Sequence, residues 1–456
     1  MPGRAGILLL ALVLLAASRA SAQIGTFFNR PGSGARAAGM ANAFIAVSDD
    51  GTAASWNPAG LGQLRKPELS VVSSTFGQSL DAQGFRTRDG LAAFTSAHSS
   101  YQSTHLDFAS LAVPVTLFGK PVTFQASWRL LYNLDYREVV SVTRVPTGPE
   151  GPPPLQANAN SDLVGGVDVF SLATAVKLTS RLSLGFCYNH WDGDWTEDQS
   201  FSQTPLPSGT SAFRTAAQTN SVAGDSVSGG LMLTYPRWSV GLVYQGALDA
   251  DFDATQQVIG TTGEEVPFQS THGTLHFPKS IGAGAAWRPA PRWTVALDFT
   301  WDEWTDAILD TPEVGHINFL DGLPPDRTSS RDTLAVNAGA EHLFFGESFV
   351  VPLRFGAAWE PQGARDPYTR DPVSFVMVAA GTGYNTNSLK FDAAFQYRWA
   401  SYETGGDFGI RAVQSEVPLA VGERRSQEWR LKFSLIVRIT DTEKLHRTIK
   451  KIFGSS

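Results

Sequence analysis

Cysteine, charge and long apolar runs are all scarce in this chain. Cys187 is the only cysteine among 456 residues, so no internal disulfide can form. Charged residues make up 17% of the chain, and acidic residues outnumber basic ones to give a net charge of -7. This balance disfavours nucleic acid as a partner. After the N-terminal apolar run, no stretch of about 18 apolar residues occurs, and this argues against membrane-spanning helices.

Motifs for catalysis and metal binding are missing as well. The sequence has no G-x-S-x-G elbow, no H-E-x-x-H and no P-loop lysine. Gly32 to Ala37 matches a dinucleotide loop only superficially, because no βαβ unit follows it. His272 and His276 have no cysteine nearby, and a solvated face is the favoured interpretation of the acidic run Asp298, Asp302, Glu303 and Asp306. We predict no enzyme activity, no cofactor and no metal.

The N-terminus has the pattern of an export signal. Arg4 precedes the apolar run Gly6 to Ala17, and Ala20-Ser21-Ala22 provides a small-x-small cleavage site before Gln23. Residues 1 to 22 are therefore predicted to be a signal peptide. The absence of a cysteine at position 23 argues against lipoprotein attachment.

Several segments alternate strictly between apolar and polar residues. In Arg292 to Asp302, one face of an extended chain carries Trp293, Val295, Leu297, Phe299 and Trp301, and the other carries polar residues including Asp298. The same alternation returns in 389–399 and in 429–439. An exported chain with such strands and no spanning helix predicts a transmembrane β-barrel with lipid outside and a polar lumen inside. A soluble β-sandwich is the alternative, because its strands also alternate.

Fourteen strands are predicted, which makes the fold all-β. Their approximate ranges are 68–77, 105–116, 122–142, 162–178, 181–196, 220–235, 237–252, 274–288, 292–304, 332–344, 349–360, 373–382, 388–402 and 427–440. Short connections alternate with long ones such as 197–219 and 253–272. Short periplasmic turns and long outer loops are typical of an antiparallel outer-membrane barrel.

Two segments flank the predicted barrel of residues 67–440. Residues 23–66 are rich in Gly and Ala and lack sustained alternation, which predicts a compact plug or a disordered leader. Residues 441–456 place Leu445, Ile449, Ile452 and Phe453 at helical spacing beside lysines and an arginine. This pattern predicts a short basic amphipathic tail.

The N-terminal segment resembles the hatch of the FadL/TodX (OmpP1) family of outer-membrane channels for long-chain fatty acids and hydrocarbons. The likeness rests on residues 35–40, 43–50 and 54–61, and most of all on Asn57-Pro58-Ala59 after an Asp-Asp pair. A second match begins at Phe277-Pro278-Lys279 and ends at Trp304. The resemblance implies a fourteen-stranded barrel whose lumen is closed by the hatch at residues 23–66, with Asn57, Pro58 and Ala59 as a rigid turn that gates passage.

Two features depart from the family pattern. About sixteen residues follow Thr440, whereas family members commonly finish on the last strand. The family's third strand is kinked to form a side window, yet Val122 to Val142 contains neither Gly nor Pro. A lateral exit is therefore not predicted from this sequence.

The favoured function is a passive outer-membrane channel for hydrophobic small molecules. Ligand contacts are predicted from the long loops at Phe201, Phe213, Ile259 and Phe268. Lumen-facing cations are predicted either to pair with a substrate carboxylate or to balance lumen carboxylates such as Asp298 and Asp392; they are Arg129, Lys390, Arg398 and Arg430.

The predicted partners are a hydrophobic small-molecule ligand and outer-membrane lipid with lipopolysaccharide, around a monomeric barrel. The chief alternative function is a barrel of the same superfamily that anchors or shuttles a secretion machine without transport. An outer-membrane acyl hydrolase or acyltransferase is a further alternative, but it needs a Ser or His arrangement that the sequence does not show.

Overall fold

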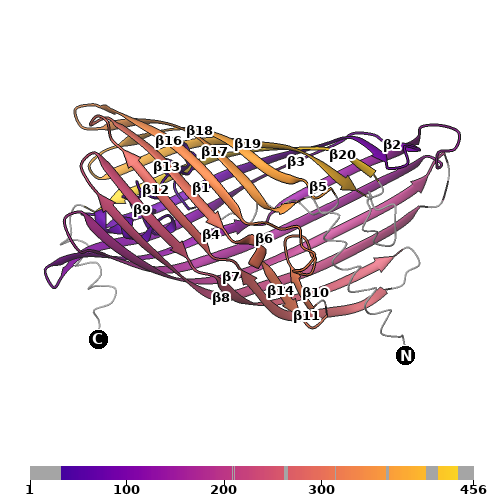
Figure 1. Cartoon of the computed structure of the whole chain (residues 1–456), viewed down its shortest axis with the longest axis horizontal. Helices are drawn as coiled ribbons and strands as arrows, with labels where there is room; N and C mark the ends of the chain where they lie inside the picture. The colour runs from indigo at the N-terminus through magenta and orange to yellow at the C-terminus, as the bar shows by residue number, and fades with distance from the viewer. Residues whose placement is uncertain are drawn as a thin grey trace.

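The computed structural model describes residues 32–207, 209, 211–260, 265–313, 315–365, 369–406 and 420–439. The predicted signal peptide 1–22 and tail 441–456 lie outside the described residues. Among the described residues, no helix is both long and apolar enough to cross a membrane. One antiparallel sheet closes on itself, because the last strand pairs with the first from Glu68↔Arg438 onward (Figure 1).

Fourteen strand positions form the ring, as the sequence predicts. Three positions are each built from two consecutive strands, namely β4 with β5, β9 with β10, and β11 with β12. The strands are β1 Glu68–Thr87, β3 Ala97–Leu117, β4 Lys120–Asn133, β5 Tyr136–Pro146, β6 Leu155–Lys177, β7 Leu182–Pro205, β8 Ala212–Thr234, β9 Trp238–Gln245, β10 Leu248–Gly260, β11 Glu265–Phe277, β12 Ser280–Trp287, β13 Trp293–Asp302, β16 Thr333–Phe345, β17 Val350–Arg365, β18 Pro372–Asn385, β19 Leu389–Gly406 and β20 Ala420–Arg438. Short strands β2 Ala92–Phe94, β14 Ile308–Thr311 and β15 Gly315–Asn318 belong to the connections.

The two faces of the ring carry opposite chemistry. Large apolar side chains point outward and are exposed, with Phe355 at 61% and Leu172 at 64%. On β19, Phe391 and Phe395 are exposed while Lys390 and Asp392 between and beside them are buried. An apolar outer belt and a polar interior are what lipid requires of a spanning strand, so the ring is a transmembrane β-barrel.

The strands on one side of the barrel are far longer than a bilayer needs. β7 contains 24 residues and β8 contains 23, whereas about 9–11 residues span a membrane. Predicted loops such as 197–219 are therefore wrong over most of their length: β7 continues to Pro205 and β8 begins at Ala212. The reason is that beyond the lipid both faces of a strand can be polar, so the alternation that marks a strand disappears.

Residues 32–66 lie inside the ring, at the end where the short turns gather (Figure 1). They form the short helix α2 Ala35–Gly39 and the 3-10 turns η2 Ala53–Ser55 and η3 Pro58–Gln63. Most of these residues are buried. A further 3-10 turn, η4 Trp304–Asp306, follows β13.

Candidate functional site

The N-terminal segment, residues 32–66, is fastened to the barrel wall through its own backbone. The Asp298 carboxylate on β13 accepts hydrogen bonds from the backbone N–H groups of Phe44 at 2.5 Å and Ile45 at 2.7 Å. Asn337 donates to the Ala41 carbonyl at 2.8 Å, and Gln396 donates to the Ala38 carbonyl at 3.1 Å. Polar lumen side chains thus replace water for a loop whose backbone groups would otherwise be buried without partners.

Asn57, Pro58 and Ala59 form the start of η3. Asn57 is fully buried, and its Oδ1 accepts from the Ala59 backbone N–H at 3.1 Å as the N-cap of the turn. Its Nδ2 donates to the carbonyls of Ile45 and Leu231, each at 3.2 Å. Pro58 occupies the first position of the turn, where its fixed φ fits. The triplet therefore ties the segment to itself and to β8.

The wall has no side chains where this turn approaches it. A Cβ added to Gly230 would come within 2.1 Å of Asn57 Oδ1, and one added to Gly185 would come within 2.2 Å of the Pro58 carbonyl carbon. Glycine is required at both positions because the backbones of turn and wall are in near contact.

A buried charge network joins the segment to three strands. Arg36 of α2 donates to both carboxylate oxygens of Glu341 on β16, at 3.0 and 3.1 Å. The same carboxylate accepts from Arg354 of β17 at 2.7 Å, and Arg354 also donates to Asp392 of β19 at 2.7 Å. The Arg354 side chain is completely buried. Each charge is compensated by a partner, which a buried ion pair requires.

The predicted lumen cations lie inside the barrel, with different partners. Arg398 donates to Glu428 at 2.5 Å and to Glu360 at 3.0 Å, so two carboxylates compensate it. Arg430 lies over the Phe76 ring, 5.5 Å from its centroid. Lys390 is buried near Asp50 of the N-terminal segment. Burial of Asp50 opposes its charge, but the positive charges of Lys390 and Arg36 lower its pKa below the ordinary value.

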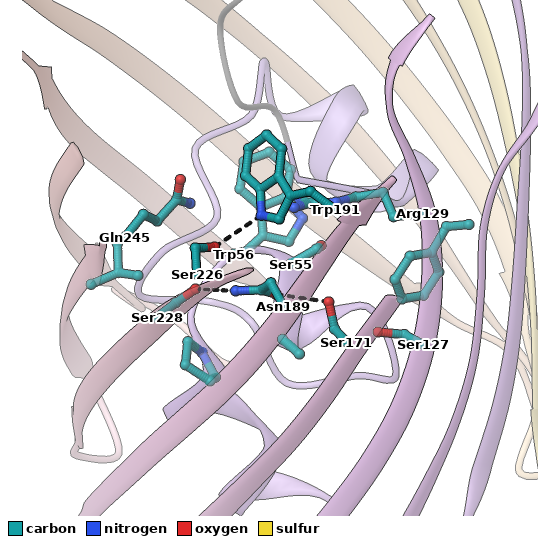
Figure 2. Close-up of a pocket in the computed structure, with 14 residues that line it drawn as sticks. Ser55, Trp56, Ser127, Arg129, Ser171, Asn189, Trp191, Ser226, Ser228 and Gln245 are labelled. Atoms are coloured by element: carbon teal, nitrogen blue, oxygen red, sulfur yellow. Dashed lines mark hydrogen bonds between the residues drawn. The ribbon is translucent and has the colours of Figure 1, made fainter. Parts of the chain in front are cut away.

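Arg129 lines a small polar cavity between the N-terminal segment and the wall (Figure 2). Trp56 and Pro58 lie on one side of it, and Asn189 and Trp191 of β7 lie on the other. Asn189 donates to Ser228 Oγ at 2.9 Å, and Trp191 Nε1 donates to Ser226 Oγ at 2.9 Å. The free space is about 20 Å³, enough for a water molecule but not for a benzene ring.

An apolar cluster adjoins this cavity, because Trp191 belongs to both. It is centred on four buried aromatic residues, Tyr132, Trp191, Phe277 and Trp304. Tyr132 stacks on Phe277 with ring centroids 5.7 Å apart, and Trp191 lies 5.7 Å from Phe277. The remaining buried members are aliphatic. Most come from β4, β6, β8 and β10, Leu134 follows β4 and Ala307 follows η4; they are Leu131, Leu134, Val167, Val169, Val222, Leu248, Ala250 and Ala307. An apolar cluster of this kind in a polar lumen is the surface that an apolar ligand would bind.

The barrel wall has a seam beside this cluster, which corrects the prediction of an unbroken third strand over 122–142. β4 pairs with β3 only as far as Arg129↔Phe108, and the chain leaves strand geometry at Leu134 and Asp135 before β5 begins. β5 pairs with β6 and β2, and no ladder joins it to β3 within the described residues.

Side chains cross the seam in place of backbone hydrogen bonds. Asn133 Nδ2 lies 3.1 Å from both Ser103 Oγ and His105 Nδ1. The Val139 N–H donates to Ser99 Oγ at 3.2 Å. Leu131, Tyr132 and Leu134 of the apolar cluster are close in sequence to Asn133. The polar contacts that Asn133 makes across the seam therefore lie next to the apolar cluster.

The break arises from the neighbouring strand. Gly165 of β6 has φ 129°, which a residue with a Cβ rarely adopts. Its N–H donates to Asp135 Oδ1 at 3.0 Å, and its carbonyl accepts from the Leu134 N–H at 3.0 Å. The β4–β6 register shifts between Leu130 and Tyr132. The glycine that permits the break is therefore absent from the broken strand itself.

The four residues predicted on ligand-binding loops lie on strands, which corrects that placement. Phe201 is on β7, Phe213 on β8, Ile259 on β10 and Phe268 on β11. Phe201 packs against an apolar cluster that includes Phe85 and Phe94, while Phe213 is 48% exposed. The position of the Phe268 side chain lies outside what the structure describes.

Comparison with solved structures identifies proteins that have a similar fold. No family model and no curated protein matches the sequence. Among solved structures, a Pseudomonas aeruginosa FadL homologue is 13% identical with a TM-score of 0.63, over 90% of this chain and 98% of its own. The Pseudomonas putida toluene transporter TodX is 14% identical with a TM-score of 0.57, over 91% of this chain and all of its own. The CymD monoaromatic hydrocarbon channel is 14% identical with a TM-score of 0.51, over 91% of this chain and 99% of its own. The chain therefore has the FadL/TodX barrel fold, which is an outer-membrane architecture.

Proposed function

We propose that this protein is a passive outer-membrane channel that takes up apolar small molecules. The observation that carries the proposal is the buried aromatic cluster around Phe277, which lies in the lumen beside a break in the wall. The similar structures include a toluene transporter and a monoaromatic hydrocarbon channel, and this supports an apolar ligand. The proposed barrel is a monomer whose outer belt contacts outer-membrane lipid and lipopolysaccharide.

The proposed path runs from the end of the barrel opposite the N-terminal segment through the aromatic cluster and out through the seam. An apolar ligand gains by leaving water at the cluster, and its next apolar surroundings are the acyl chains outside the β3–β5 seam. The cavity at Arg129 is lined largely by polar side chains, so it and residues 32–66 beside it offer an apolar ligand less apolar surface than the aromatic cluster does. A monoaromatic hydrocarbon fits this path better than a fatty acid, because Arg398 is already compensated by two carboxylates.

Removal of the central aromatic ring tests the proposal. We expect Phe277→Ala to lower the uptake of dilute toluene roughly tenfold, because the ligand loses stacking and contact area equivalent to a kcal/mol or more. The measurement is the initial uptake of radiolabelled toluene by cells in which this protein is the only hydrocarbon channel. Phe355→Ala, which removes an exposed ring from the outer belt, is the matched control. Equal uptake by both variants and the unmodified protein would contradict the proposal.

We propose further that residues 32–66 act as a hatch, with Asn57-Pro58-Ala59 as its gating turn. Pro58→Ala frees φ and adds a backbone donor, which should loosen the turn by about 1 kcal/mol. Pro58 lines the same cavity as Trp191 of the aromatic cluster, so a looser turn should disturb the inner end of the apolar path and change toluene uptake severalfold while the barrel stays folded. Pro152→Ala in the connection between β5 and β6 is the control. Unchanged uptake in Pro58→Ala, with folding verified by the faster migration of unheated barrel on a gel, would remove the gating role from this turn.

A further inference from the structure

A row of amide and carboxyl side chains crosses four adjacent strands in the long extension of the barrel. Glu197 of β7 is opposite Gln218 of β8, Gln218 is opposite Gln256 of β10, and Gln256 is opposite Gln269 of β11. We call these four residues the amide row. Side chains directly opposite each other in antiparallel strands lie on the same face of the sheet.

The amide row faces the lumen above the aromatic cluster. Trp195 packs against that cluster and lies 6.3 Å from Phe252 between ring centroids. Glu197 follows Trp195 by two residues on β7, so both side chains point to the same face. At about 3.3 Å per residue, the amide row is roughly 7 Å farther out than Trp195.

The hydrogen bonds of this row leave one acceptor open. The Gln218 amide donates along its own strand to Asn220 Oδ1 at 2.6 Å, and the Gln199 amide donates to Glu197. The side chains therefore do not form a closed amide ladder between strands. Gln256 is only 8% exposed, and its Oε1 has no hydrogen-bond donor among the described residues. A buried acceptor without a partner is costly, so this position is suited to a donor that arrives from outside the chain.

We propose that the amide row binds the neutral hydrogen-bonding head of an amphiphilic ligand whose apolar body enters the aromatic cluster. This inference rests on the proposed channel function and adds to its hydrocarbon ligands a preferred class, namely molecules that also have a hydroxyl or amide group at one end. A glutamine amide both donates and accepts, which matches a hydroxyl. The row contains no cation, and Arg214, the inward cation on β8, is two rows farther out, opposite Phe201. An ionised ligand carboxylate would meet the carboxyl group of Glu197 instead and would find no positive charge in the row to compensate it.

Three probes that share a phenyl ring and a six-carbon chain test the proposal: 6-phenylhexan-1-ol, hexylbenzene and 6-phenylhexanoate. Their affinities are measured by equilibrium dialysis against the full chain in lipid nanodiscs, with empty nanodiscs subtracted. We expect the alcohol to bind at least fivefold more tightly than either other probe. Gln256→Met keeps the side-chain length but removes the acceptor, and it should weaken alcohol binding about fivefold while hexylbenzene binding stays unchanged.

Matched variants separate the amide row from general effects on the barrel. Gln257→Met changes the next residue on β10, which points to the opposite face, and it should leave all three affinities unchanged. Gln218→Met is the second test variant if Gln256→Met does not fold. Equal loss of alcohol and hydrocarbon binding in both row variants, or tighter binding of the carboxylate than of the alcohol, overturns the amide-row proposal and leaves the channel intact. If no probe binds the unmodified protein, the channel function fails, and the amide-row proposal fails with it.

Discussion

Joining the two sides of the seam is expected to abolish uptake. In a Cys187→Ser background, Ser103→Cys and Asn133→Cys place one thiol on each side, at positions whose present side chains touch at 3.1 Å. A short bis-methanethiosulfonate reagent then links β3 to β4, and a ligand that leaves through the seam is trapped behind the link. Toluene uptake should fall to the level of cells without the protein and return when reductant cleaves the reagent.

The control pair is at a place where the wall is already continuous. Thr75 and Thr104 are opposite each other on the hydrogen-bonded β1–β3 ladder, with hydroxyl oxygens 2.9 Å apart. Linking Thr75→Cys to Thr104→Cys should leave uptake unchanged. If the two linked proteins transport equally well, ligand does not leave through the seam.

The second large effect concerns stability. Glu341→Ala should lower the free energy of unfolding by about 3 kcal/mol, because it leaves the buried Arg354 and the partly buried Arg36 short of a compensating charge. Arg36 and Arg354 both donate to this carboxylate, and Arg354 is completely buried. The measurement is urea unfolding of the barrel in lipid vesicles.

Glu313→Ala, at an exposed position outside the barrel strands, is the control and should change stability little. A loss below about 1 kcal/mol in Glu341→Ala would show that the network does not stabilise the fold, since removal of one partner from a buried pair typically costs more. Displacement of the N-terminal segment alone would appear as protease cleavage within residues 32–66 without loss of the barrel.

The strands that span lipid could be predicted from sequence because their signal is local. Trp293 to Trp301 alternates apolar and polar residues within a single strand, and lipid outside with polar groups inside imposes that period on every spanning strand. All fourteen predicted strands correspond to positions in the ring. For the extensions beyond the lipid, the sequence pattern predicts loops, since a strand with water on its outer face need not alternate.

The parts of the site that sequence reasoning missed depend on distant residues. Asn133 and Asp135 are turn-forming residues within the predicted third strand, but the break also needs Gly165 of β6. The charge network joins Arg36 to Glu341 across 305 positions, and no spacing rule connects them. Asp298 was predicted to be a lumen carboxylate, yet its partners are backbone N–H groups of the N-terminal segment, which residue types do not reveal.

The central claim is that an apolar ligand occupies the lumen at the aromatic cluster, and anomalous scattering from a bound halogen tests it most directly. Crystals of the full chain are soaked with bromobenzene, and the bromine position is located from its anomalous signal. The account predicts a bromine among the rings of Tyr132, Trp191 and Phe277, whose centroids lie 5.7 to 6.2 Å apart. Bromine found only on the outer belt, at a concentration that saturates uptake, would contradict it.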